Sequence, residues 1–257
     1  DTGAVTISAA TVTDDGTFDF PSATGTLNID VEGVLGDLTV TGGADTQFTT
    51  LTIGGSSQQA TVTLGDNGVT DQIIMGTASD TTTVTLSGFQ EGETAAGVAI
   101  TGADAIDLSN SGIEAMGETS SLILATTAAV VTTNTHVLVN IVVGTPTDLD
   151  LITQTATILV LDGNFATSGM VETALEAGGS TALTAGAAIA DNDGFLVAWD
   201  DGTNSYLSLL TNRSAGTEAD GATITSGALV AQTLITFSGV SDVDTLTVAN
   251  FGTAFIT

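Results

Sequence analysis

A glycine-containing turn recurs at a nearly constant interval in residues 1–112, and this interval limits the folds open to the chain. The turns lie 12, 11, 11 and 12 residues apart, at Gly42, Gly54, Gly65, Gly76 and Gly88. Most follow a segment in which apolar residues alternate with threonine, as in Leu38-Thr39-Val40 and Val62-Thr63-Leu64. This period of two predicts strands with one buried face.

Two all-β folds explain such a step. A β-solenoid or β-roll stacks each turn of the chain on the last. Strand-and-turn units of about 8–12 residues are equally typical of an antiparallel β-sandwich. We therefore expect residues 1–112 to be solenoid- or roll-like or a sandwich, and we favour the roll.

Residues 113–257 are predicted to form a second β-rich region with one short helix. The helix is expected over residues 168–177, with Ser168 as its N-cap and Gly178-Gly179 at its end. Apolar segments on both sides of Asp201-Gly202 indicate a β-hairpin. The predicted strands cover residues 122–124, 137–143, 158–161, 195–199, 206–210, 234–237 and 246–251.

The charge of the chain is extreme, with 30 acidic residues against a single basic one, Arg213, and a formal net charge of −29. Binding to nucleic acid needs many Lys and Arg side chains and is excluded, as is binding to an anionic membrane surface. No apolar run reaches the ~20 residues of a membrane helix, so we expect no membrane insertion.

Subunits with this charge repel one another unless cations bind. Most of the acidic residues are aspartates beside glycines in turns, and short carboxylates of this kind are typical ligands of Ca²⁺. The alternative is the solvated acidic surface of a halophilic protein, but the turn positions favour calcium. Asp191-Asn192-Asp193-Gly194 is either a lone calcium site or a plain turn, with Asp191 and Asp193 as its candidate ligands.

Residues 65–111 resemble the repeats-in-toxin proteins, whose calcium β-roll uses a Gly-Gly-x-Gly-x-Asp-x-apolar repeat. Gly65-Asp66-Asn67-Gly68-Val69-Thr70-Asp71-Gln72-Ile73 matches with one extra residue before the second aspartate. The resemblance implies that Asp66, Asp71 and Asp80 are calcium ligands. Residues 87–93 and 104–109 look like the segment that closes such rolls.

Residues 168–257 resemble the C-terminal regions of type I secreted proteins. The features that carry this resemblance include the Gly178-Gly179 helix end and Leu234-Ile235-Thr236-Phe237-Ser238-Gly239. It implies an uncleaved C-terminal export signal and an extracellular or cell-surface location. No N-terminal secretion signal is visible, which fits this route. Members of the family range from S-layer proteins and adhesins to proteases and lipases, so the resemblance implies a route and not an activity.

We expect no enzymatic activity. The single histidine, His136, lies in a strand-like segment, and the chain has no Gly-x-Ser-x-Gly motif. The paired carboxylates Asp14-Asp15, Asp200-Asp201 and Asp242/Asp244 could serve glycoside hydrolysis, but such pairs more often form turns or bind cations. One Trp and one Tyr are also few for a sugar-binding cleft.

The sequence therefore predicts a self-assembling extracellular structural protein, such as an S-layer, sheath or filament subunit, stabilised by Ca²⁺. Its main partner would be further copies of itself, and cell-surface polysaccharide is a possible second partner. The alternative is a calcium-dependent adhesin module that binds a surface or a glycan. An array protein would be abundant and ordered, whereas an adhesin would be scarce and bind a defined ligand.

Overall fold

The chain folds into two compact units, of mainly β structure as predicted. Unit 1 consists of Asp1–Ile113, Ile235–Val240 and Thr245–Thr257, and unit 2 of Glu114–Leu234 and Ser241–Asp244. Unit 1 thus includes two C-terminal segments, whereas the sequence predicted that all residues from 113 to 257 belong to the second region. The computed structural model describes residues 5–8, 14–20, 25–32, 34, 36–53, 59–65, 68–76, 83–108, 121–123, 137–152, 157–214 and 216–251.

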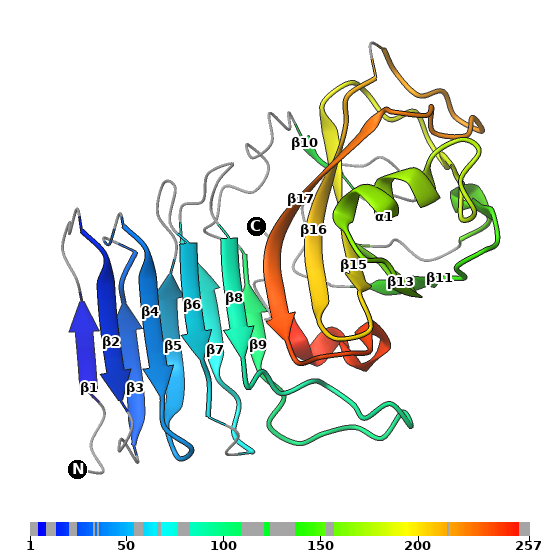
Figure 1. Cartoon of the computed structure of the whole chain (residues 1–257). Helices are drawn as coiled ribbons and strands as arrows, with labels where there is room; N and C mark the ends of the chain where they lie inside the picture. The colour runs from blue at the N-terminus through cyan, green and yellow to red at the C-terminus, as the bar shows by residue number, and fades with distance from the viewer. Residues whose placement is uncertain are drawn as a thin grey trace. The chain divides into compact units, whose positions relative to one another are not determined.

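Unit 1 contains two sheets between which the chain alternates, strand by strand (Figure 1). The first sheet has the order β1 (Val5–Ser8), β3 (Thr26–Asp30), β5 (Gln47–Ile53), β7 (Gln72–Met75) and β9 (Ala105–Asp107). The second has the order β2 (Gly16–Phe20), β4 (Leu38–Gly42), β6 (Gln59–Thr63), β8 (Thr83–Ser87) and the end of β17 (Leu229–Ser238).

Every strand pair described within unit 1 is parallel. Asp15 and Asp37, which lie in matching turns, are 22 residues apart. The same step joins Gly16 to Leu38 and Leu38 to Ala60 across the second sheet. Two of the 11–12-residue intervals in the sequence therefore make one structural repeat. The antiparallel pairing of a sandwich does not occur among these strands.

The core of unit 1 lies between the two sheets and follows the alternation seen in the sequence. Leu38 and Val40 of β4 are buried, as are Ile29 of β3 and Leu51 of β5, whereas Thr39 between the first two is exposed. Burial of apolar side chains stabilises a fold by about 25 cal/mol per Å². The inward-facing residues are therefore the main source of stability of this unit.

Glycine is needed where successive repeats come close together. A Cβ atom on Gly65 would lie 2.4 Å from the carbonyl oxygen of Gly43, and one on Gly88 would lie 2.6 Å from that of Leu64. Gly88 also has a φ of +73°, a conformation that other residues rarely adopt. Close packing between turns thus explains two of the recurring glycines.

A C-terminal segment returns to the end of unit 1. The short 3-10 helix η4 (Val248–Asn250) begins with a capping box between Thr247 and Asn250. The buried Asn250 side chain donates hydrogen bonds to the carbonyl oxygens of Gln90 at 3.0 Å and Asp104 at 2.9 Å. The predicted strand over residues 246–251 is therefore wrong, because local capping by Thr247 and Asn250 stabilises a helical turn there.

Unit 2 is built on a mixed sheet. β11 (Leu138–Ile141), β13 (Ile158–Asn164) and β15 (Asp193–Asp200) pair in parallel, and β15 and β16 (Ser205–Asn212) form the predicted antiparallel hairpin. The first part of β17 follows β16. The smaller elements are β10 (Ser121–Leu122), which pairs with β15, β12 (Thr147–Asp148), which pairs with β14 (Leu183–Thr184), and the 3-10 helices η2 (Leu149–Leu151) and η3 (Val243–Thr245).

The one α-helix among the described residues, α1, spans Ser168–Leu175 in unit 2. Its N-cap is Thr167, whose side chain accepts a hydrogen bond from the Met170 backbone N–H. The prediction of Ser168 as the N-cap was therefore wrong by one residue. No described helix is long and apolar enough to span a membrane.

Two glutamates, Glu172 of α1 and its C-cap residue Glu176, accept hydrogen bonds from the start of β17 and the loop before it. Glu176 is buried, and its carboxylate accepts backbone N–H groups of Gly227 and Leu229, both at 2.7 Å. Glu172, one turn earlier, accepts the N–H of Ala231 at 2.6 Å. These carboxylates satisfy backbone donors on β17 and the loop before it that would otherwise lack a partner.

Candidate metal centre

Three aspartates of unit 2 bring their carboxylates together. Asp162, Asp242 and Asp244 have carboxylate oxygens that all lie within 4.8 Å of one another. Within the described ranges, this is the one group of three or more acidic, His or Cys side chains that meets so closely. Asp162 is exposed and the other two are half-buried, so the group is open to solvent.

An irregularity in β13 positions Asp162. The pairing of β13 with β15 shifts register between Leu161 and Asn164, and Asp162 lies within this shift. Such a bulge redirects a side chain away from the regular alternation of the strand. Asp162 can therefore point towards the loop that carries the other two aspartates.

Asp242 and Asp244 lie at the start of η3. The Oδ1 atom of Asp242 accepts the backbone N–H of Asp244 at 3.1 Å, which fixes the turn. The Oδ1 atom of Asp244 accepts a hydrogen bond from the Asn140 side-chain amide at 2.9 Å. Asn140 is an exposed residue of β11, so three separate parts of unit 2 supply polar groups to this centre.

A fourth carboxylate lies behind the first three. Asp200, at the end of β15, is only 4% exposed and accepts the backbone N–H groups of Gly202 at 3.0 Å and Gly163 at 3.3 Å. Burial raises the pKa of Asp200, these two hydrogen bonds lower it, and the negative charges of Asp162 and Asp242 raise it further. The net result is a raised pKa, with burial as its largest cause and the neighbouring carboxylates as a smaller one.

The arrangement suits a hard cation. Ca²⁺ takes six to eight oxygen ligands, commonly from carboxylates, amide or backbone carbonyls and water. Three carboxylates with one nearby amide side chain provide such a set, and an exposed site leaves room for water. A bound divalent ion would offset the mutual repulsion of the aspartates and lower the pKa of Asp200.

Of the ligands implied by the repeats-in-toxin resemblance, Asp66 and Asp80 lie outside the described residues. Asp71 is fully buried in unit 1, and its Oδ1 atom accepts the backbone N–H of Phe48 at 2.7 Å. Its own N–H donates to Oδ1 of the buried Asp104 at 2.9 Å. Its other oxygen, Oδ2, is buried with no hydrogen-bond partner in the described part of the chain.

This environment raises the pKa of Asp71 to about 7. Burial is the largest cause, the charge of Asp104 adds to it, and the hydrogen bond from Phe48 acts against it. Asp104 also accepts the backbone N–H of Gln90 at 2.8 Å through its second oxygen. The two buried aspartates thus link successive turns of unit 1 through backbone groups, and the calcium role of Asp71 stays a prediction.

Asp191 and Asp193 lie together in a turn of unit 2. Oδ2 of Asp193 accepts the Ala190 backbone N–H at 2.9 Å, and Asn192 between them has a φ of +66°. The Arg213 guanidinium donates to the Asn192 side chain at 3.2 Å. These contacts account for a turn, and calcium binding by Asp191 and Asp193 stays a prediction.

The sequence contained part of the signal for the centre in unit 2. Asp200 and the Asp242/Asp244 pair stood out as neighbouring carboxylates in turns, but Asp162 did not. Only the sheet register, in which Leu161 pairs with Trp199 and Asn164 with Asp200, brings Asp162 to the end of β15. That register depends on long-range pairing and not on any local motif.

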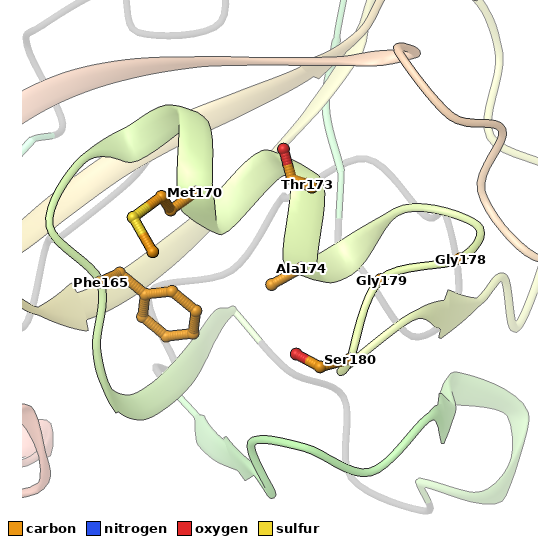
Figure 2. A pocket seen from close by; sticks show the side chains of 7 residues that line it. All are labelled: Phe165, Met170, Thr173, Ala174, Gly178, Gly179 and Ser180. Atoms are coloured by element: carbon orange, nitrogen blue, oxygen red, sulfur yellow. The ribbon is translucent and has the colours of Figure 1, made fainter.

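Unit 2 also has a shallow pocket beside α1, with a volume of about 360 Å³. Figure 2 shows the Met170 and Phe165 side chains facing Ala174 and Ser180 across this space. Its remaining lining residues are Thr173, Gly178 and Gly179. None of the lining residues is acidic, basic or histidine, so the pocket has no group for acid–base chemistry or metal binding.

Comparisons with models of protein families, with curated proteins and with solved structures find no match to this chain. The interpretation of its function therefore depends on its own residues and geometry.

Proposed function

We propose that this chain is a self-assembling extracellular structural protein, a subunit of an S-layer, sheath or filament, that binds Ca²⁺. The observation that carries this proposal is the convergence of Asp162, Asp242 and Asp244 within 4.8 Å in a chain with 30 acidic residues and one basic residue. Dense packing of such subunits requires cations to neutralise them. The acidic centre is a place where a cation would bind.

The parallel architecture of unit 1 supports a β-roll as its finer fold. Its strands alternate between two sheets, and paired strands are 22 residues apart from β2 to β4 and from β4 to β6, and 24 apart from β6 to β8. In this proposal Asp66, Asp71 and Asp80 are further calcium ligands, as the resemblance to repeats-in-toxin proteins implies. The same resemblance supports type I export and a location outside the cell.

Electron microscopy of the purified chain tests assembly. With millimolar Ca²⁺ we expect ordered sheets, tubes or filaments, and after excess chelator we expect them to disperse. Dispersed chains under both conditions would contradict the structural role and would favour a calcium-dependent adhesin module instead.

A pair of matched variants tests the acidic centre. Asp242→Asn/Asp244→Asn removes two charges but keeps the side-chain oxygens that accept the local hydrogen bonds. Asp150→Asn/Asp220→Asn removes two charges from exposed positions of unit 2 outside the centre. We expect only the first variant to lose calcium affinity in titration calorimetry and to lose the calcium-dependent rise in melting temperature. Equal calcium binding by both variants would show that the centre is not the site.

A further inference from the structure

The outward face of the second sheet of unit 1 carries two files of side chains in register, and nine of these ten side chains bear a hydroxyl group. In the first file, Thr17 pairs with Thr39, Thr39 with Thr61, Thr61 with Thr85 and Thr85 with Thr236. The second file, two residues further along each strand, is Asp19, Thr41, Thr63, Ser87 and Ser238. We call these ten positions the threonine face.

The burial pattern places these side chains on the outer surface of the sheet. Their neighbours along the strands, such as Leu38, Val40 and Val62, are buried. Because successive side chains of a strand point to opposite faces, the hydroxyls point away from the core. Thr17, Thr39 and Thr61 are exposed. Within the described part of the chain, no hydrogen bond occupies a side chain of the threonine face.

The spacing of the face is that of a regular grid. Neighbouring strands lie about 4.8 Å apart, and residues i and i+2 of one strand lie about 6.6 Å apart. Figure 1 shows β2, β4, β6 and β8 side by side with little change of direction, so the grid has little twist from one strand to the next. A repeating array of hydroxyl and methyl groups suits a ligand that is itself a repeating lattice.

The threonine face is nearly uncharged, although the chain has a net charge of −29. Asp19, at the outer strand, is its one acidic member. A second copy of the chain would have to bind through cations that bridge carboxylates, and this face offers only the carboxylate of Asp19 for such a bridge. None of the ten positions is aromatic, whereas crystalline polysaccharide is usually held by aromatic side chains that pack against its sugar rings. A neutral lattice without sugar rings fits the face best.

Ordered water is such a lattice. When waters are linked tetrahedrally by hydrogen bonds of about 2.8 Å, second-neighbour oxygens lie about 4.5 Å apart. This distance is close to the strand spacing of about 4.8 Å. The hydroxyls of one file, which lie on successive strands, can therefore occupy positions of water oxygens in the lattice. The threonine methyl groups lie between them. We propose that the threonine face binds the surface of ice.

The first sheet of unit 1 offers a matched control, because its outward residues are chemically mixed. Asn28 accepts a hydrogen bond from Thr50 at 3.1 Å, Asp30 pairs with Thr52, and Thr52 pairs with Ile74. That face presents amide, carboxylate, hydroxyl and apolar groups and no continuous hydroxyl file. A bulky residue at the half-buried Thr52 should disturb the fold at least as much as one at the exposed Thr61, without touching the proposed contact.

The test compares the full chain with Thr61→Tyr and Thr52→Tyr in calcium-containing buffer, with circular dichroism to verify folding. The readouts are the gap between melting and freezing temperatures of a single ice crystal, and the fraction of protein taken up into slowly grown ice. We expect the parent chain and Thr52→Tyr to show both effects. Thr61→Tyr, with a ring in the centre of the grid, should lose them.

Three results would overturn the proposal. One is a folded parent chain that is excluded from ice and shows no freezing gap. Another is full activity in folded Thr61→Tyr. The third is binding to crystalline cellulose or chitin without any effect on ice, which would assign the face to polysaccharide. The proposal does not depend on the acidic centre, and folded Asp242→Asn/Asp244→Asn should keep its ice activity.

Discussion

The two units of this protein use buried carboxylates in opposite ways. In unit 2, Glu176 is 5% exposed, and both of its oxygens accept backbone N–H groups, from Gly227 and Leu229. In unit 1, Asp71 is fully buried, but only one of its oxygens accepts a hydrogen bond among the described residues. Both oxygens of the first carboxylate therefore have backbone donors, whereas burial of the second favours a neutral acid or a nearby cation.

The regularity of the two units differs as well. Unit 1 repeats one strand-and-turn pattern, so most positions of a strand pair with an equivalent position in the next repeat. Unit 2 combines parallel and antiparallel pairs with a helix, and β15 is buried on both faces from Gly194 to Asp200. A repeated pattern places like side chains in files, whereas an irregular one brings unlike side chains into clusters. The threonine face and the acidic centre illustrate these two outcomes.

The largest effect is expected at Glu176. Glu176→Ala leaves the buried N–H of Leu229 and the partly buried N–H of Gly227 without an acceptor, and a fully buried donor of this kind costs about 1 to 3 kcal/mol. We expect a loss of about 2 to 4 kcal/mol in the free energy of unfolding, measured by urea denaturation. Glu176→Gln keeps one acceptor oxygen and should lose less. Equal losses in the two variants would show that packing of the side chain, and not its hydrogen bonds, anchors β17.

Asp71 should give the opposite result. Its ordinary pKa is 3.8, and in the folded chain it is about 7. Between these values the folded state keeps a proton that the unfolded state has lost, so this group's contribution to stability falls as pH rises from about 4 to 7. Asp71→Asn keeps the acceptor for Phe48 but cannot ionise. It should be more stable than the parent chain at pH 8, by on the order of 2 kcal/mol.

Thermal melts at pH 4 and pH 8 with chelator present test the Asp71 prediction. The two chains should differ little at pH 4, where the parent carboxyl is neutral. A parent chain that is more stable than Asp71→Asn at pH 8 without calcium would contradict the burial argument, and with it this contrast between the units.

The smallest effect is expected in the hairpin turn of unit 2. Burial raises the pKa of Asp201, but hydrogen bonds from the Tyr206 hydroxyl and from Asn204 and Thr203 outweigh it and lower the pKa. The stabilisation is therefore present above the ordinary pKa of 3.8 and is lost as pH falls below it. Tyr206→Phe should cost about 0.5 to 1.5 kcal/mol near neutral pH.

Urea denaturation of Tyr206→Phe at pH 7 and pH 3 measures the contribution of this hydrogen bond to the free energy of unfolding. The difference from the parent chain should shrink at the lower pH, because the carboxyl of the unfolded chain binds a proton below its ordinary pKa of 3.8. A difference that stays constant between the two values would assign the effect to packing of the Tyr206 ring on Trp199, whose centroids are 4.1 Å apart.

Some elements of the fold were predictable because their signals are local. The alternation around Thr39 and Thr61 predicted strands, and the apolar segments around Asp201-Gly202 predicted the hairpin. The end of α1 was visible in Gly178-Gly179. The segment around Val248 was misassigned as a strand, because its apolar content outweighed the weaker signal of the capping residues Thr247 and Asn250.

Sequence alone was sufficient for the β-rich class, the short helix, the extreme negative charge and the repeat of the turns, because these depend on composition and on neighbours along the chain. It was not sufficient for the meeting of Asp162 with Asp242 and Asp244, the burial of Asp71 against Asp104, or the threonine files. These depend on which strands pair and in what register. Register is decided by the packing of whole sheets, so residues far apart in the chain become neighbours only in the tertiary structure.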